Sequence, residues 1–464
     1  MGNVFSRKLT KRDPIHSPPA SPPVPSTCAV VPLAKTSNFA MPNIPPEIYD
    51  KIIMYVMDDR TDLRSCALAS IHFLDVSRRY LFHHIVLDSP EKWEQFQAFV
   101  DDSSAVPKHA VIFDFYVEPF VWKALEGTDQ PTLAKISDCM ATFLNLKTLR
   151  IRFQPPIPPE KISPSVSPNL ASIVRALSKS AKLERLDVVA DTFPSSLRVV
   201  SQFHYLKHFV IEHESIPSPE YQQMMTMFEG VQNATPIMLE SLEMTFSKSS
   251  SQHLFNWVLH PQNPVKLIQL QRLIIHTQDG LAGHLRFCLI LRLFADSLKV
   301  LLFDPSTDVS TNQDSAMQDP LNFSVFKNLQ HLGLSVDCVN FGISTAPRDN
   351  LDPIKWITTK LDTLDKATNQ VQILELHFYY TFGSFSFDVS HWQVVVAAII
   401  RNLPRLRLVD VRISESDFSL EIIRRMEEHI KPLRDFCLVQ LKSIDHPDQG
   451  FRFPDTLKTL RLFG

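Results

Sequence analysis

Glycine is scarce in this chain, at only 10 of 464 residues against 34 prolines. Folds that hold phosphate groups in glycine-rich loops are therefore hard to place, and no phosphate-binding loop is present. The His-Glu-x-x-His and Gly-x-Ser-x-Gly motifs of metalloproteases and serine hydrolases are also missing. These absences weigh against an enzyme, and we expect no catalytic residue and no cofactor. A hydrolase hidden in the later part of the chain is the remaining enzymatic alternative.

Closely spaced cysteines and long apolar runs are lacking too. No two of the six cysteines lie within four residues of each other, so no zinc-ligand or redox spacing is present; they are Cys28, Cys66, Cys139, Cys288, Cys338 and Cys437. We expect reduced thiols and no metal site. No segment reaches the roughly 18 to 20 apolar residues of a membrane span, and no secretory signal opens the chain. The sequence predicts a cytoplasmic protein, with the nucleus as an alternative.

A surplus of one charge sign is absent as well. The chain has 47 basic and 50 acidic residues, for a formal net charge of -3. Nucleic-acid binders usually carry a basic surface, so we expect no nucleic-acid partner. The hydrophobic content of 44% and charged content of 21% are typical of a folded soluble protein.

The first 40 residues form a proline-rich tail without an apolar period, which favours a disordered or polyproline-type linker. The chain begins Met-Gly-x-x-x-Ser, with Gly2 and Ser6, which is the pattern for N-terminal myristoylation. A basic cluster follows directly, at Arg7, Lys8, Lys11 and Arg12. One acyl chain holds a protein to a membrane only weakly, and a basic patch is the usual second signal. We therefore predict lipidation at Gly2 and peripheral membrane contact; the alternative is a solvated tail.

Residues 41–87 predict three short amphipathic helices. Pro45, Pro46 and Glu47 begin the first helix, since proline in the first turn and an acidic residue near the helix N-terminus are both favourable. Its apolar positions recur at helical spacing, at Ile48, Ile52, Ile53, Val56 and Met57. Two further helical patterns follow, at residues 63–68 and 73–81. A bundle of about 45 residues has a thin core, so we expect it to need a partner or the rest of the chain.

Residues 88–464 are dominated by a recurring Leu-x-x-Leu-x-Leu pattern with conservative replacements. Its copies begin at Leu146, Leu183, Leu206, Leu239, Leu270, Leu298, Leu329, Val371, Leu406, Leu433 and Leu457, and Phe82 begins a matching copy. The last two apolar positions of each copy alternate along a short strand, and the first lies in the turn that enters it. The copies recur at 23 to 42 residues, more widely than regular leucine-rich repeats. We predict an α/β fold: a degenerate leucine-rich-repeat solenoid with a parallel sheet and outer helices, such as 170–180 and 394–402.

Residues 42–87 resemble the F-box motif in the form common in mushroom-type fungi. The matching segments are Ile44-Pro45-Pro46-Glu47-Ile48, Cys66-Ala67-Leu68-Ala69 and Arg78-Arg79-Tyr80-Leu81-Phe82, although Phe73 stands where many F-boxes have tryptophan. The resemblance implies binding to the Skp adaptor and, through it, to a cullin. It places these residues at or just behind the interface: Ile44, Pro45, Ile48, Ile52, Leu63, Ala67 and Phe73. The alternative is that they only close the helical bundle, which we favour for Ile53 and Leu81.

Residues between the two core positions of each strand should face away from the core and form a substrate surface. Arg150, Asp187, Glu243, Glu375 and Asp410 are the candidates for substrate contact, and Arg461 is a further charged residue of the same kind. Their mixed charges suit a protein partner better than a nucleic acid. The sequence thus predicts a substrate-recruiting adaptor of a Skp–cullin–F-box ubiquitin ligase. The alternative is a leucine-rich-repeat scaffold that acts outside any ligase.

Overall fold

The structure is a computed structural model of the 464-residue chain. It describes residues 45–57, 59–102, 109–117, 124–125, 127–153, 168–180, 182–190, 200, 203–213, 236–246, 263, 265–277, 291–305, 322–337, 353–379, 391–415 and 420–445. Gly2, Ile44, the proline-rich tail and the predicted copy at Leu457 lie outside these ranges.

Three helices begin the described chain, as the apolar spacing predicted: α1 (Pro46–Val56), α2 (Arg60–Ala69) and α3 (Ile71–Leu81). Side chains cap the second and third. Asp59 accepts hydrogen bonds from the backbone N–H groups of Thr61 and Asp62, and these bonds lower the pKa of its carboxyl group. Ser70 accepts one from the N–H of Phe73. Each capping residue stands directly before the first residue of the helix that it caps.

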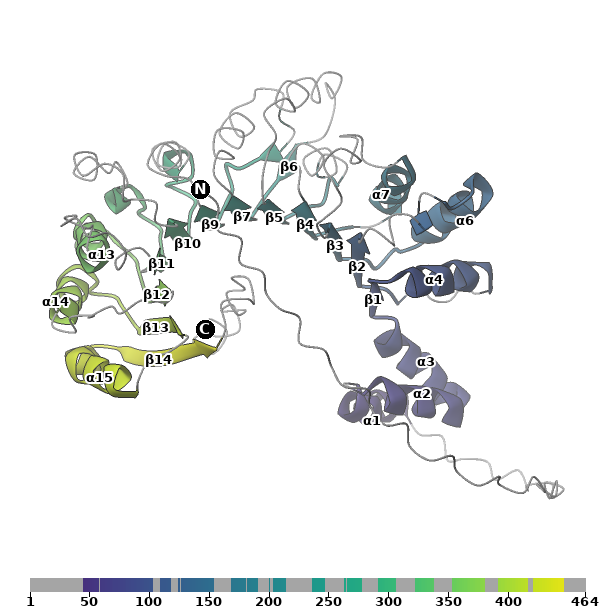
Figure 1. The fold of residues 1–464 in the computed structure, drawn as a ribbon, viewed down its shortest axis with the longest axis horizontal. Coiled ribbons are helices and arrows are strands. Elements are labelled where there is room, and N and C mark those ends of the chain that lie inside the picture. The colour runs from purple at the N-terminus through teal and green to yellow at the C-terminus, as the bar shows by residue number, and fades with distance from the viewer. Residues whose placement is uncertain are drawn as a thin grey trace, which may run out of the picture.

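The described residues then form a parallel sheet of twelve strands (Figure 1). These twelve strands lie side by side in the order in which they occur along the chain. Two short strands, β6 (Ile237–Met238) and β8 (Val265–Lys266), are not part of this sheet and pair with each other. The twelve are β1 (His84–Leu87), β2 (Ile112–Val117), β3 (Thr148–Phe153), β4 (Arg185–Ala190), β5 (His208–His213), β7 (Ser241–Phe246), β9 (Arg272–Thr277), β10 (Val300–Pro305), β11 (His331–Asp337), β12 (Ile373–Tyr379), β13 (Leu408–Glu415) and β14 (Leu438–Asp445). The predicted α/β class with a parallel sheet is confirmed.

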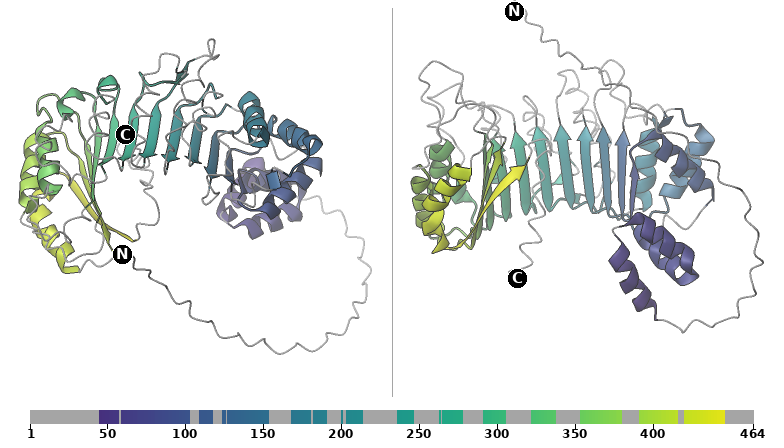
Figure 2. Two further views of the ribbon diagram at one scale, coloured as in Figure 1. Left: turned by 45° about the horizontal axis from the view of Figure 1, so that its top comes forward. Right: turned by 60° about the horizontal axis from the view of Figure 1, so that its bottom comes forward.

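Helices line the outer side of the curved sheet, and α1–α3 lie beyond its β1 end (Figures 1 and 2). The outer helices are α4 (Pro90–Asp102), α6 (Gln130–Met140), α7 (Pro168–Ser180), α13 (Pro353–Asp362), α14 (His391–Asn402) and α15 (Leu420–Arg434), with a 3-10 turn η3 (Phe323–Val325). One continuous apolar core joins helices and sheet, with Leu149 and Ile151 among its members. Because strand side chains alternate, the residues between these positions lie on the opposite, concave face.

Two details differ from the predicted pattern. Strand β2 was missed, because its copy uses Ala110, Phe113 and Phe115, all buried, in place of leucine. In β14 the predicted register was wrong. Val439 and Leu441 pair with the core residues of β13 and pack against the core, whereas Leu438 is exposed. Replacement of leucine by other apolar residues thus concealed β2 from the sequence pattern, and an exposed leucine shifted the predicted register of β14.

Within the described residues, the structure contains no helix of sufficient length and apolar character to cross a membrane.

Candidate functional site

The three-helix unit has a small core of its own. Tyr49, Ile53, Leu63 and Val76 are buried together, separately from the core of the sheet. The Tyr49 and Phe73 rings pack in a T-shaped arrangement, with their centroids 4.9 Å apart. Ile53, and Leu81 at the margin of this cluster, close the bundle as predicted. Because so few side chains fill this core, most of the remaining apolar residues of the unit stay near the surface.

An apolar stripe is exposed on α1. Ile48 (41% exposed), Ile52 (40%) and Tyr55 (91%) lie at positions i, i+4 and i+7, hence on one helix face. Further large apolar side chains of the unit are also exposed; they are Met54, Met57, Leu68 and Ile71. Exposed apolar residues gathered on one small unit are typical of a protein-docking surface. The sequence motif pointed to Ile48 and Ile52, but Tyr55 and Ile71 were missed, because only their exposure distinguishes them.

The other residues predicted at the adaptor interface fall into three groups. Pro45 is exposed next to the start of α1. Ala67 and Phe73 are half-buried, and Phe73 packs against the core of the unit. Leu63 is 1% exposed, so it supports the docking surface from behind and cannot itself contact a partner. Ile44 lies outside the described residues, as does the predicted lipidation site at Gly2.

The second candidate surface is the concave face of the sheet, which carries three rows of side chains across the strands. On β2 the members of these three rows are Ile112, Asp114 and Tyr116. Strand register aligns Asp114 with Arg150 on β3, and Arg150 with Asp187 on β4. The sequence predicted that Arg150 and Asp187 share this face. Their pairing across neighbouring strands could not be predicted, because the register of distant segments is set by the tertiary fold.

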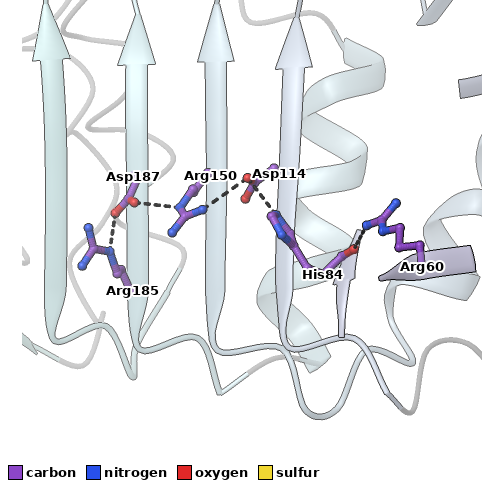
Figure 3. Close-up of polar contacts among 6 residues, drawn as sticks. All are labelled: Arg60, His84, Asp114, Arg150, Arg185 and Asp187. Atoms are coloured by element: carbon purple, nitrogen blue, oxygen red, sulfur yellow. Dashed lines mark hydrogen bonds and ion pairs between the residues drawn. The ribbon is translucent and has the colours of Figure 1, made fainter. Parts of the chain in front are cut away.

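Opposite charges alternate at the β1 end of this face (Figure 3). His84 Nε2 lies 2.9 Å from Asp114 Oδ2, and the same oxygen lies 3.3 Å from Arg150 Nη1. Arg150 Nε is 3.2 Å from Asp187 Oδ2, and Asp187 Oδ1 is 2.8 Å from Arg185 Nε. Asp114 is buried, and its contacts with His84 and Arg150 compensate for the hydration that its carboxyl group loses. These ionic contacts between neighbouring strands therefore hold the five side chains on β1–β4 in a fixed arrangement.

The middle of the same row is mostly apolar. Register aligns Val210, Glu243, Ile274, Leu302 and Gly333 across β5 to β11. Ile274 and Leu302 are buried, and burial raises the pKa of the Glu243 carboxyl group. Gly333 leaves the space that the Leu302 side chain occupies. This part of the row offers a partner apolar contact and one carboxyl group that is partly removed from water.

A buried ionic cluster occupies the β11–β13 part of the face. Glu375 lies at its centre, with His331 Nε2 3.1 Å and Arg412 Nη2 3.7 Å from one oxygen, and His377 Nε2 3.5 Å from the other. Arg412 also contacts Asp410 at 2.7 Å. Burial alone would raise the pKa of Glu375, but hydrogen bonds from the two histidines and the Arg412 charge lower it. Burial lowers the pKa of His377.

This burial corrects one prediction. Glu375 and Asp410 were expected to project from an exposed substrate surface, but they are 0% and 2% exposed. They lie on the predicted face, but both carboxyl groups contact the buried Arg412 side chain. Arg150, Asp187 and Glu243 remain half-buried, so they are accessible to a partner. Of the five predicted residues of the substrate surface, the accessible ones therefore lie on β3, β4 and β7.

Among the described residues, no group of three or more His, Cys, Asp or Glu side chains is placed to hold a metal ion. The two candidate surfaces offer apolar contact on the helical unit and fixed charges on the sheet. Apolar contact and fixed charges are both ways in which a surface can bind another protein. Comparison of the sequence with protein-family models and with curated proteins finds no match.

Proposed function

We propose that this protein is the substrate-recruiting subunit of a Skp–cullin–F-box ubiquitin ligase. In this proposal α1–α3 are the F-box and dock the Skp adaptor, which connects them to a cullin. The sheet and outer helices are a degenerate leucine-rich-repeat solenoid, and its concave face holds the protein to be ubiquitinated. The observation that carries the proposal is the exposed apolar stripe Ile48, Ile52 and Tyr55, on a helical unit with a separate core.

The placement of the motif residues supports the same proposal. Pro45 and Ile48 are exposed at the start of α1, where the F-box resemblance places the adaptor contact. Leu63 and Phe73 pack beneath this helix with Tyr49 and Ile53, and so fix its position. The strands follow one another across the sheet in chain order, as stacked repeats do. A docking unit at one end and a long binding face beside it suit an adaptor that joins two proteins.

The test is a pull-down with purified Skp adaptor, comparing the wild-type chain with an Ile48→Asp/Ile52→Asp variant. Each buried isoleucine contributes about 1.5 kcal/mol or more, so the double change should weaken binding at least about 100-fold. Val394→Asp is the matched control, because Val394 is 53% exposed on α14, far along the chain from the helical unit. It should leave binding unchanged.

A folded wild-type chain that does not bind the Skp adaptor would refute the ligase proposal. The alternative would then stand: a repeat scaffold that binds partners outside any ligase, in which α1–α3 only cap the sheet. Circular dichroism of both variants checks that a loss of binding does not come from unfolding.

A further inference from the structure

Two charged side chains on the concave face have no ionic partner within the described chain. Arg152 on β3 lies over the Tyr116 ring, with its guanidinium carbon 5.4 Å from the ring centroid. No hydrogen bond or ion pair of Arg152 occurs among the described residues, and the same holds for the exposed Glu212 on β5. Both differ in this from Arg150 and Arg185, which are held by Asp114 and Asp187.

Strand register fixes the separation of these two charges. Arg152 aligns with Val189 on β4, and Val189 aligns with Glu212 on β5, so all three stand in one row. Neighbouring strands are about 4.8 Å apart, which places the two charged positions about 9.6 Å apart across the sheet. A peptide in the polyproline II conformation advances about 3.1 Å per residue with three residues per turn, so two side chains three positions apart lie on the same face and cover the same span. Val189 supplies a partly accessible apolar position between the charges.

Arg152 is prepared to bind a carboxylate. Its stacking on Tyr116 restricts the side chain before any ligand arrives, which reduces the entropy lost on binding. A guanidinium group also presents parallel N–H donors that match a carboxylate. The neighbouring Arg150 and Arg185 do not compete, since they are neutralised by aspartates. Glu212 offers the complementary acceptor for an ammonium or guanidinium group.

We infer that the row Tyr116–Arg152–Val189–Glu212 binds a peptide segment of the recruited protein that crosses strands β2 to β5 in the polyproline II conformation. The segment carries an acidic and a basic residue three positions apart. The acidic side chain pairs with Arg152 and the basic one with Glu212, and the residues between them pack on Val189. This inference rests on the proposed function, in that the concave face holds the recruited protein, and it names the chemistry of that protein.

The experiment is selection of a displayed random heptapeptide library on the full-length protein, without Skp adaptor. Wild-type protein should enrich peptides with an acidic and a basic residue at spacing three. Arg152→Glu should enrich two basic residues at that spacing, and Glu212→Arg two acidic ones. A peptide selected on wild-type protein should bind Arg152→Glu at least about tenfold more weakly, which corresponds to about 1.4 kcal/mol for a lost charge-assisted pair.

Arg175→Glu is the matched control, because Arg175 is exposed on the outer helix α7. It should select the same peptides as wild-type protein. Enrichment of the same peptides by wild-type and Arg152→Glu proteins, or no charge pairs at spacing three, would overturn the inference. The Ile48→Asp/Ile52→Asp variant should select as wild-type protein does, so failure of this inference is distinguishable from failure of Skp binding.

Discussion

The Glu375 cluster allows one prediction to be worked out in detail. Glu375→Ala removes a fully buried carboxylate that faces His331, His377 and Arg412. Removing one partner of a buried ion pair typically costs about 3–5 kcal/mol, since the other charge loses its compensation. Arg412 keeps Asp410 at 2.7 Å, so it is not left unpaired. We therefore expect a loss near the lower end, about 3 kcal/mol.

Urea unfolding at pH 7.5, followed by tryptophan fluorescence and circular dichroism, measures this loss. Glu375→Gln keeps the volume and one acceptor oxygen, so it should cost less than Glu375→Ala, about 1–2 kcal/mol. Glu428→Ala, at an exposed position on α15, is the control and should stay within about 0.5 kcal/mol of wild type. A Glu375→Ala variant as stable as the control would refute the reasoning, because the cluster would then contribute nothing.

Acid gives a second readout of the same cluster. The pKa of Glu375 is lowered from its ordinary value of 4.5, so its ionised form stabilises the folded chain above that pH. This contribution is lost as pH falls from 4.5 through the lowered folded pKa. The free-energy difference between wild type and Glu375→Ala should therefore shrink below pH 4.5. A difference that stays constant down to pH 3 would contradict the assignment.

Two further predictions concern other sites. Gly333→Ala should destabilise the protein by about 1–3 kcal/mol, because the added Cβ would overlap the buried Leu302 side chain. In a Leu302→Ala background the same change should cost less, and equal costs in urea unfolding would argue against this contact. Burial raises the pKa of Cys437 to about 11, so iodoacetamide at pH 8.5 should alkylate it more slowly in the native than in the urea-unfolded chain. Equal rates by mass spectrometry would contradict that burial.

The local pattern was sufficient to predict most of the strands. At β3, Leu149 and Ile151 alternate along the strand and Leu146 lies in the turn before it, and this spacing alone predicts a strand with one buried face. The same reasoning missed β2, where Phe113 and Phe115 replace leucine. It also misplaced β14, because Phe436 and Leu438 satisfy the pattern although Leu438 is exposed. Residue type alone cannot decide between two registers that are both partly apolar.

The sequence by itself determined the α/β class, the three N-terminal helices and the apolar residues that form the sheet core. These follow from periodicity over a few residues, which each segment carries within itself. Only the tertiary structure decided which side chains of the concave face are accessible. Glu375 and Glu243 occupy equivalent strand positions, yet Glu375 is fully buried and Glu243 is not. Their difference depends on neighbours from distant segments, which no local pattern records.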